Sequence, residues 1–222
     1  MVHSRLYVSV LYAIAMHGGV VAMAELEIIG PAHDAGVRIC RMACIEKGIL
    51  YRFREIDYGS LQALKENMFG SLPALRHGKI RLFEIRGITH YIDHRFNGRA
   101  LVPSDPIRSA EVEQWIGVIH SRLGKLMGAQ SAAAAIQCDD TQSCLKVLNE
   151  CIGSRTWLVG RGFTLADMWL LPAVHNFCMH TGHTHLLRDL PAIGIWYDKH
   201  KSRKSWQSLC GGESPNTEGT TN

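Results

Sequence analysis

The chain changes its periodicity near residue 100, and this change constrains its fold more than any other feature. Before it, strand-like segments at 26–29, 51–56 and 80–83 alternate with helical spacing at 34–47, 61–66 and 84–96. After residue 105 everything periodic is helical, with helices expected over 106–130, 138–152, 164–181 and 191–203. This order predicts an α/β domain at 25–97, a linker at 98–105 and an all-α domain at 106–209.

Local signals support this division. The opening strand, helix and strand predict a parallel strand pair with a right-handed crossover. Residues 72–83 indicate a hairpin around Gly78. At the linker, Asp105 is a candidate N-cap, and Pro106 stands at the first helical position.

Composition is that of a globular protein with a sizeable core, at 46% apolar and 20% charged residues. The net charge of +4 is spread along the chain without a Lys/Arg block, so we expect no nucleic-acid partner. The seven cysteines include no C-x-x-C pair, which favours free thiols, a reducing compartment and a cytoplasmic protein. We expect no membrane partner.

The two ends of the chain need separate interpretation. Residues 1–24 combine a basic start, an apolar run and an Ala22-Met23-Ala24 site, the pattern of a signal peptide. The alternative is an upstream start codon with Met23 as the true beginning, which the free cysteines favour. The polar tail at 210–222 is expected to be disordered.

Three ordered segments resemble a known family. They are Gly30-Pro31-Ala32-His33-Asp34 leading to Cys44-Ile45-Glu46-Lys47-Gly48; Asn67-Met68-Phe69-Gly70-Ser71-Leu72-Pro73-Ala74-Leu75 continuing into Leu82-Phe83-Glu84-Ile85; and Phe163-Thr164-Leu165-Ala166-Asp167, with Ser202-Arg203-Lys204-Ser205-Trp206 near the end. Together they resemble the glutathione S-transferase superfamily, and most closely its phi-like members.

The resemblance implies a thioredoxin-like glutathione-binding domain followed by a helical substrate domain. It implies a cis bond before Pro73, so that the backbone of Leu72 pairs with glutathione, with Ser71, Glu84 and Ile85 beside it. The family places a carboxylate of glutathione at the N-terminus of the helix that Glu84 opens, although Ile85 stands where the family has a serine. Glu84 can equally be a favourable acid in a first helical turn.

The implied function is transfer of glutathione, as co-substrate, to an electrophilic hydrophobic small molecule, or elimination of a group from one. The implied state is a homodimer, and no metal is expected. The alternative is a non-catalytic relative that binds a ligand or a protein partner.

The catalytic position is altered. The family's serine aligns with Asp34, whose carboxylate only accepts hydrogen bonds and repels a thiolate. Asp34 can instead cap the first helix. His33 could donate to the thiolate, or be an exposed loop residue. The loop between Ile56 and Asn67 is also shorter than in phi-like members.

Other residues allow two interpretations each. Trp115, Ile119 and His120 are expected at the wall of the substrate cleft, although their helical stripe also fits the core. Thr164 and Asp167 form a capping box with a structural role. Cys40 and Cys44, at i,i+4, suit core packing. A cluster of histidines with one cysteine has no trusted metal-ligand spacing: His175, Cys178, His180, His183 and His185.

Overall fold

The computed structural model describes residues 25–210, without the side chains of residues 129–131. The signal-like segment at 1–24 and the tail from residue 211 lie outside the described residues. We call residues 25–97 the sheet part and residues 106–210 the helical part. Their division into two domains stays a prediction.

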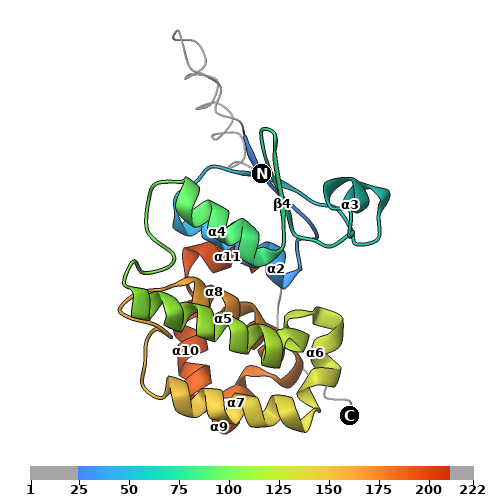
Figure 1. Ribbon diagram of the computed structural model, residues 1–222. Coiled ribbons are helices and arrows are strands. Elements are labelled where there is room, and N and C mark those ends of the chain that lie inside the picture. The colour runs from blue at the N-terminus through green and yellow to red at the C-terminus, as the bar shows by residue number, and fades with distance from the viewer. Residues whose placement is uncertain (1–24, 211–222) are drawn as a thin grey trace, which may run out of the picture.

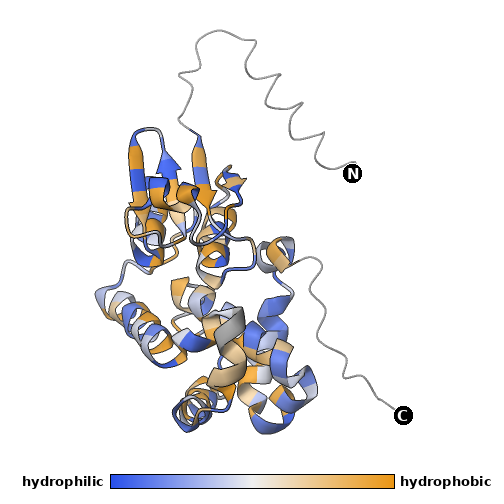
Figure 2. Cartoon of the chain, turned by 90° about the vertical axis from the view of Figure 1, so that its right-hand side faces the viewer, coloured by the Kyte–Doolittle hydropathy of each residue, from blue (hydrophilic) through white to orange (hydrophobic). Residues whose placement is uncertain are grey.

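The sheet part contains four strands in the order β2-β1-β3-β4 (Figure 1). Strand β1 (Leu26–Ile29) pairs in parallel with β2 (Arg52–Arg54) and antiparallel with β3 (Ala74–His77), which pairs with β4 (Ile80–Phe83). The parallel pairing of β1 with β2 is as predicted. Each strand carries both hydrophilic and hydrophobic residues, and its successive side chains point to opposite faces of the sheet (Figure 2).

Helices cover both faces of this sheet. Helices α2 (Ala35–Glu46) and α4 (Ile85–Arg95) share one core with Ile28 and Leu75, which are fully buried. The short helix α3 (Leu61–Glu66) covers the other face through Ala63, in a small cluster with Ile29 and Ala74. Helix α2 therefore lies between the sheet and the helical part (Figure 1).

The helical part is built around α8 (Leu165–Thr181), which is buried along most of its length and packs against α5 (Pro106–Met127). The remaining helices are α6 (Ala129–Ile136), α7 (Asp139–Ile152), α9 (His183–Asp189), α10 (Pro191–Lys201) and α11 (Lys204–Cys210). As expected, Asp105 caps α5, accepting the Arg108 N–H at 2.9 Å.

The structure corrects three expectations about the helices. The helix expected over 106–130 ends at Met127, because Gly128 adopts an extended conformation (φ −89°, ψ 125°) and α6 begins after it. The region after Thr181 was not expected to be helical, yet α9 occupies residues 183–189. The helix expected over 191–203 ends at Lys201, and α11 begins separately at Lys204.

The Thr164–Asp167 capping box is present and structural, as predicted. Asp167 is fully buried and accepts the N–H of Thr164 at 2.8 Å and that of Leu158 at 2.9 Å. Burial raises the pKa of this carboxyl, although the same hydrogen bonds oppose the shift. The capping box therefore fixes the N-terminus of α8 and the loop that precedes it.

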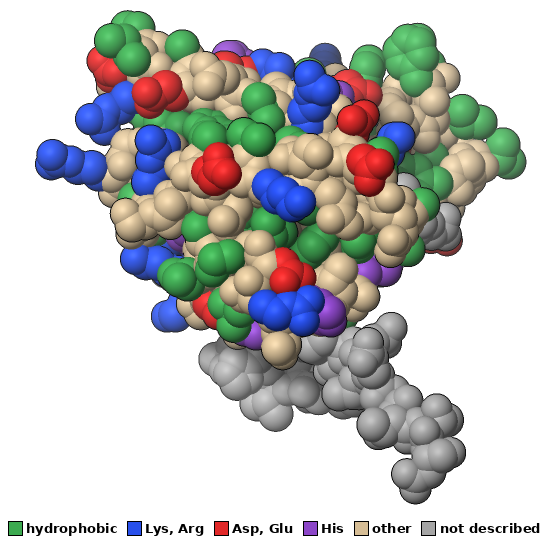
Figure 3. Space-filling model, turned by 90° about the horizontal axis from the view of Figure 1, so that it is seen from below, with side chains coloured by type: hydrophobic (Ala, Val, Ile, Leu, Met, Phe, Trp, Pro, Cys, Tyr) green, Lys and Arg blue, Asp and Glu red, His purple; other side chains and the backbone are tan. Residues whose placement is uncertain are grey.

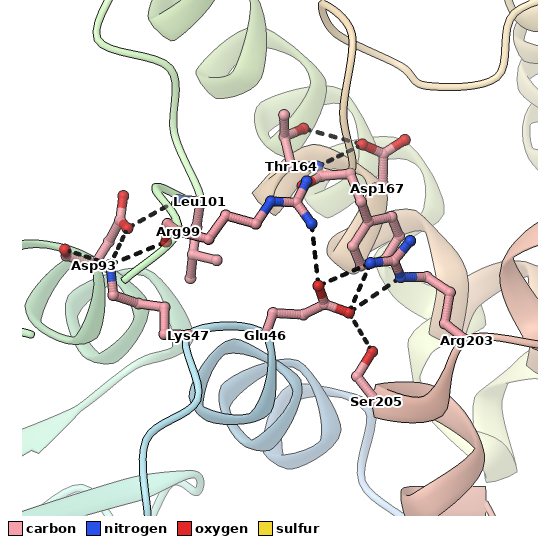
Figure 4. A network of polar contacts seen from close by, with 10 residues as sticks. Glu46, Lys47, Asp93, Arg99, Leu101, Thr164, Asp167, Arg203 and Ser205 are labelled. Atoms are coloured by element: carbon pink, nitrogen blue, oxygen red, sulfur yellow. Dashed lines mark hydrogen bonds and ion pairs between the residues drawn. The ribbon is translucent and has the colours of Figure 1, made fainter. Parts of the chain in front are cut away.

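A polar cluster around Glu46 joins the two parts of the molecule (Figure 4). Glu46, at the end of α2, accepts hydrogen bonds from Arg203 at 2.8 Å, Arg99 at 3.1 Å and Ser205 at 2.5 Å. Burial opposes its ionisation, but the hydrogen bonds from Arg203 and Ser205 outweigh burial and lower its pKa. The Ser202–Trp206 segment thus holds α11 against the sheet part.

His200 is the fully buried histidine of α10, and it makes stability depend on pH. Its Nε2 donates to the Thr156 carbonyl at 2.8 Å, and rings of Trp157, Phe163 and Trp196 surround it. Burial lowers its pKa to about 4. Because the unfolded chain takes up this proton near pH 6.5, the unfolded state binds more protons between these two values.

We therefore expect the free energy of unfolding to fall as pH drops from 7 to 4.5, with His200 contributing about 2 kcal/mol of the loss. The H200Q variant should lose less stability over this range, as measured by urea denaturation at each pH. Identical pH dependence of variant and wild type would contradict this origin of the effect.

The outer surface of the helical part carries mixed charge. On the face opposite the sheet, basic, acidic and apolar side chains are interspersed (Figure 3). Among residues 25–210, no helix is long and apolar enough to cross a membrane.

Candidate functional site

A groove of about 450 Å³ lies between the sheet part and α5. The sheet part contributes the start of α2, residue Leu72 and the start of α4, whereas α5 contributes its C-terminal half. The lining residues that matter below are Asp34, Ala35, Gly36, Leu72, Ile85, His120 and Met127. Residues far apart in the sequence thus meet in one place, as the resemblance implied for Asp34, Leu72 and Ile85 and as the helical stripe predicted for His120.

The Leu72–Pro73 peptide bond is cis, as the resemblance implied. Strand β3 begins only at Ala74, so Leu72 lies outside the ladder with β1. No other backbone group among the described residues pairs with the N–H or C=O of Leu72. An extended backbone with a free amide pair at a groove can bind a peptide-like ligand in the manner of an added strand.

Asp34 caps helix α2, which confirms the plainer of its two interpretations. Its Oδ1 accepts the Val37 N–H at 2.8 Å, and its Oδ2 accepts the Tyr58 hydroxyl at 2.7 Å. Both oxygens therefore act as acceptors, and neither can donate to a thiolate. Burial and the bond to Asp34 raise the pKa of the Tyr58 phenol, which stays protonated.

The hydrogen-bond donors that remain unpaired at the N-terminus of α2 are backbone N–H groups. Among the described residues, no acceptor takes the N–H of Ala35 or of Gly36. Both line the groove, at the positive end of the helix dipole. His33 is exposed and is not among the lining residues, so the structure gives it no contact with the groove.

The start of α4 has an unusual backbone. Glu84 is the N-cap residue and has φ +68°, a conformation that non-glycine residues rarely adopt. Ser71 donates to Glu84 Oε1 at 3.3 Å, and Asn67 in turn donates to the Ser71 hydroxyl at 2.6 Å. Strained residues held by their surroundings gather at binding sites, and Ile85, which follows Glu84, lines the groove.

Ile85 lies in the first turn of α4, and its side chain has no hydroxyl group to donate a hydrogen bond. A Cβ built at Gly36 would lie 2.7 Å from Ile85 Cδ1, so the two helix starts approach each other closely. The absence of a side chain at Gly36 thus makes room for Ile85 in the groove floor. The first-turn N–H groups of α4 remain as donors for an anion.

The three residues of α5 that were expected to line the substrate cleft lie in three different environments. His120 lines the groove and makes an edge contact with Trp169 at 5.9 Å between ring centroids. Ile119 is fully buried in the core. Trp115 lines a different cavity, on another side of α5. His120 was therefore predicted correctly, and Trp115 and Ile119 were not, because helical spacing does not determine which neighbour a helix face contacts. Met127, further along α5, lines the groove with His120.

The cysteines of α2 are core residues, as predicted. Cys40 and Cys44 are fully buried, and burial raises the pKa of Cys40 well above its usual range and that of Cys44 to about 12. Neither thiol can act as a nucleophile at neutral pH.

The histidine cluster near the end of α8 is not a shared site. Its members have separate partners: His175 bonds Tyr197, His180 bonds the Asn176 carbonyl, and His183 bonds Asp198. Within the described part of the chain, no three or more potential ligands are grouped to hold a metal ion.

Known proteins share this architecture. The sequence model of the glutathione S-transferase N-terminal domain matches residues 36–100. Glutathione S-transferase F13 of Arabidopsis thaliana is 32% identical over 156 residues, which cover 62% of this chain and 71% of that protein.

Solved structures agree in fold. A serine-to-cysteine variant of poplar glutathione transferase F1 has a TM-score of 0.72 at 23% identity, covering 83% of this chain and 96% of that one. A glutathione S-transferase of Methylobacillus flagellatus with GSH bound has a TM-score of 0.72 at 18% identity, covering 83% and 98%.

A thioredoxin-like sheet part followed by helices, with a groove between them, defines a glutathione-transferase fold. The chain belongs to the glutathione S-transferase superfamily and is of the phi-like type.

Proposed function

We propose that this protein transfers glutathione to an electrophilic, apolar small molecule, or eliminates a group from one. One observation carries the proposal: a single groove joins the free backbone of Leu72, the N-termini of α2 and α4, and a wall from α5. The sheet part would serve as the glutathione-binding domain and the helical part as the substrate domain. The M. flagellatus relative with GSH bound supports glutathione as the ligand.

Glutathione would lie across the sheet part. Its cysteinyl backbone would pair with the N–H and C=O of Leu72, as an added strand does. Its γ-glutamyl carboxylate would accept first-turn N–H groups of α4 at Ile85, beside Ser71 and Glu84. Because Ile85 brings no hydroxyl and the Ser71 hydroxyl already donates to Glu84, this end of the ligand is held by backbone N–H groups of α4.

The sulfur would face the start of α2. There the N–H groups of Ala35 and Gly36 and the helix dipole favour the thiolate. The Asp34 carboxylate opposes it, because like charges in one groove raise the pKa of the thiol. The reaction would therefore be slower than with a neutral donor at residue 34.

The second substrate would occupy the remainder of the groove against His120 and Met127. The cavity of about 450 Å³ suits a small molecule. Thioether and imidazole surfaces favour an apolar or aromatic electrophile.

The I85S variant tests the place of the γ-glutamyl carboxylate. A serine hydroxyl in the first turn of α4 should tighten glutathione binding by about tenfold, since a hydrogen bond to a charged group contributes about 1.5 kcal/mol. Calorimetric titration with glutathione measures the change. The R86S variant, one residue further along α4 and exposed, is the control and should leave the affinity nearly unchanged. Weaker or equal binding by I85S would contradict this placement.

We also propose a homodimer in the cytoplasm. Seven free cysteines suit a reducing compartment. Met68 and Phe69 are 80% and 74% exposed, and the Phe69 ring meets that of Phe83 at 5.8 Å, so an apolar patch faces outward from the sheet part. Such a patch favours association.

The F69S variant should weaken the dimer by about tenfold or more, because exposed aromatic anchors dominate interface energies. Sedimentation over a dilution series measures the change. The I195S variant alters an equally accessible apolar residue of α10, 67% exposed, and serves as the control. A monomeric wild type would refute the homodimer.

Retention on glutathione agarose followed by a conjugation assay with 1-chloro-2,4-dinitrobenzene tests the function. Retention, elution by free glutathione and turnover above the uncatalysed rate are expected. Retention without turnover would instead identify a non-catalytic binding protein, and failure of both would refute the proposal.

A further inference from the structure

The wall that α5 gives to the groove combines one imidazole with bare backbone. His120, Gly124 and Gly128 line the groove at successive turns of the chain, together with Met127. A Cβ built at Gly124 would come within 4 Å of no other group, its own helix backbone and chain neighbours aside. The space beside the His120 ring is therefore open, and a flat substrate can lie against this wall.

The His120 ring is held in place, but its nitrogens are unused. It makes an edge contact with Trp169 of α8, at 5.9 Å between ring centroids and 78° between ring planes, and Trp169 is only 2% exposed. The Trp169 indole N–H has no hydrogen-bond partner, so it engages neither nitrogen of the imidazole. Among residues 25–210, no hydrogen bond or ion pair reaches His120. Because a neutral imidazole has one N–H, His120 keeps a donor for a ligand in the groove.

Charge is distributed unevenly across the groove. The sheet side holds the Asp34 carboxylate, close to the proposed position of the sulfur. The α5 side holds His120, Ser121 and Lys125, which can all donate hydrogen bonds and carry no negative charge. A reaction that moves negative charge from the sulfur toward α5 is therefore favoured, because the charge leaves a carboxylate and approaches donors.

We propose that His120 is a catalytic residue, which donates a hydrogen bond to the oxygen of the electrophile on which negative charge develops during attack. This inference rests on the proposed transferase function. It favours electrophiles whose reacting carbon is conjugated to a carbonyl or nitro oxygen. The sulfur attacks from the start of α2, while the oxygen points toward α5.

An α,β-unsaturated ketone illustrates the step. The thiolate sulfur bonds to the β-carbon, the electron pair of the C=C bond shifts toward the carbonyl, and the oxygen becomes an enolate oxygen. The His120 N–H stabilises this oxygen, as a donor placed where charge develops does. The α-carbon then takes up a proton from water, which balances the proton that the thiol released to water.

Lys125 also lines the wall, but His120 is the better placed donor. Lys125 is exposed, and its ammonium is strongly hydrated on a flexible stem of four carbons. Ordering such a side chain on a substrate costs conformational entropy. The imidazole of His120 is already positioned by the buried Trp169 ring, so little freedom is lost when it donates.

Two aromatic substrates of similar size test this role. Benzylideneacetone has a carbonyl oxygen conjugated to the carbon that is attacked, whereas benzyl chloride releases chloride and contains no oxygen. The measured quantity is the ratio of kcat/KM for benzylideneacetone to kcat/KM for benzyl chloride, at saturating glutathione. H120L should lower this ratio by about tenfold or more, since a hydrogen bond to a charged oxygen is lost. The loss should fall on kcat, because the charge exists only after attack has begun.

Two further variants complete the test. H120Q keeps an N–H donor and should recover most of the ratio, whereas R122A alters an exposed residue of α5 outside the lining and should keep the wild-type ratio. An unchanged ratio in H120L, a loss in KM alone, no recovery in H120Q, or a ratio that falls in K125M but not in H120L would each overturn the role of His120 and leave the transferase function standing. If wild type turned over neither substrate, the transferase function would fail, and this inference with it.

Discussion

Replacing Asp34 with serine is expected to raise the rate of glutathione conjugation by about tenfold or more near pH 6.5. The wild-type carboxylate lines the groove and accepts hydrogen bonds from Val37 and Tyr58, so it places a negative charge where the sulfur would lie. Serine is also a good N-cap, so α2 should keep its start. Its hydroxyl can donate to the thiolate, which the carboxylate cannot do.

The measurement is the pH profile of the initial rate with 1-chloro-2,4-dinitrobenzene at saturating glutathione. The rising limb should move to lower pH in D34S, because the thiol of bound glutathione ionises more readily. The D57S variant removes an equal charge from an exposed residue outside the lining, and its profile should follow wild type. Superimposable profiles of D34S and wild type would show that the sulfur does not lie near residue 34.

Removing the Glu46 side chain is expected to lower the free energy of unfolding by about 3 kcal/mol. The E46A variant loses the two-point bond to Arg203 and the bonds to Arg99 and Ser205. The loss of stability is large because the Glu46 and Arg203 side chains are only 10% and 23% exposed. Without Glu46, the Arg203 guanidinium is left unpaired and poorly solvated. Since this cluster joins α2 to α11, the contact between the two parts should loosen as well.

Urea denaturation followed by tryptophan fluorescence and by circular dichroism measures the loss. The matched control is E113A, which breaks the surface ion pair between Arg86 and Glu113, whose side chains are 59% and 46% exposed. Exposed pairs of this kind contribute less than about 1 kcal/mol. If E46A and E113A cost the same, the Glu46 cluster does not hold the two parts together.

Much of the fold could be predicted because local signals and packing agree. The strand at 26–29 and the helix at 61–66 have the expected bounds. Gly128 was missed because glycine within helical spacing does not reveal its backbone conformation. Helix α9 has seven residues, too few to form alone, and depends on packing: Leu186 is fully buried, and a Cβ at Gly194 would lie 2.7 Å from Leu187.

The groove was predictable only where the resemblance supplied motifs. Leu72 and Ile85 do line it, whereas the bond from Tyr58 to Asp34 had no signal in the sequence. That bond depends on the path of the loop after β2, which local residue preferences do not determine. Trp115, Ile119 and His120 are close in helical spacing. That spacing does not determine which of them lines the groove, which lines another cavity and which is buried in the core.

The most direct test of the proposed site is titration of the thiol of bound glutathione, labelled with ¹³C at its cysteinyl Cβ and followed by nuclear magnetic resonance. If the tripeptide lies along Leu72 with its sulfur at the start of α2, the thiol pKa should be lower in D34S than in wild type by about one unit or more. A label that titrates identically in both proteins, or as free glutathione does in both, would contradict the site.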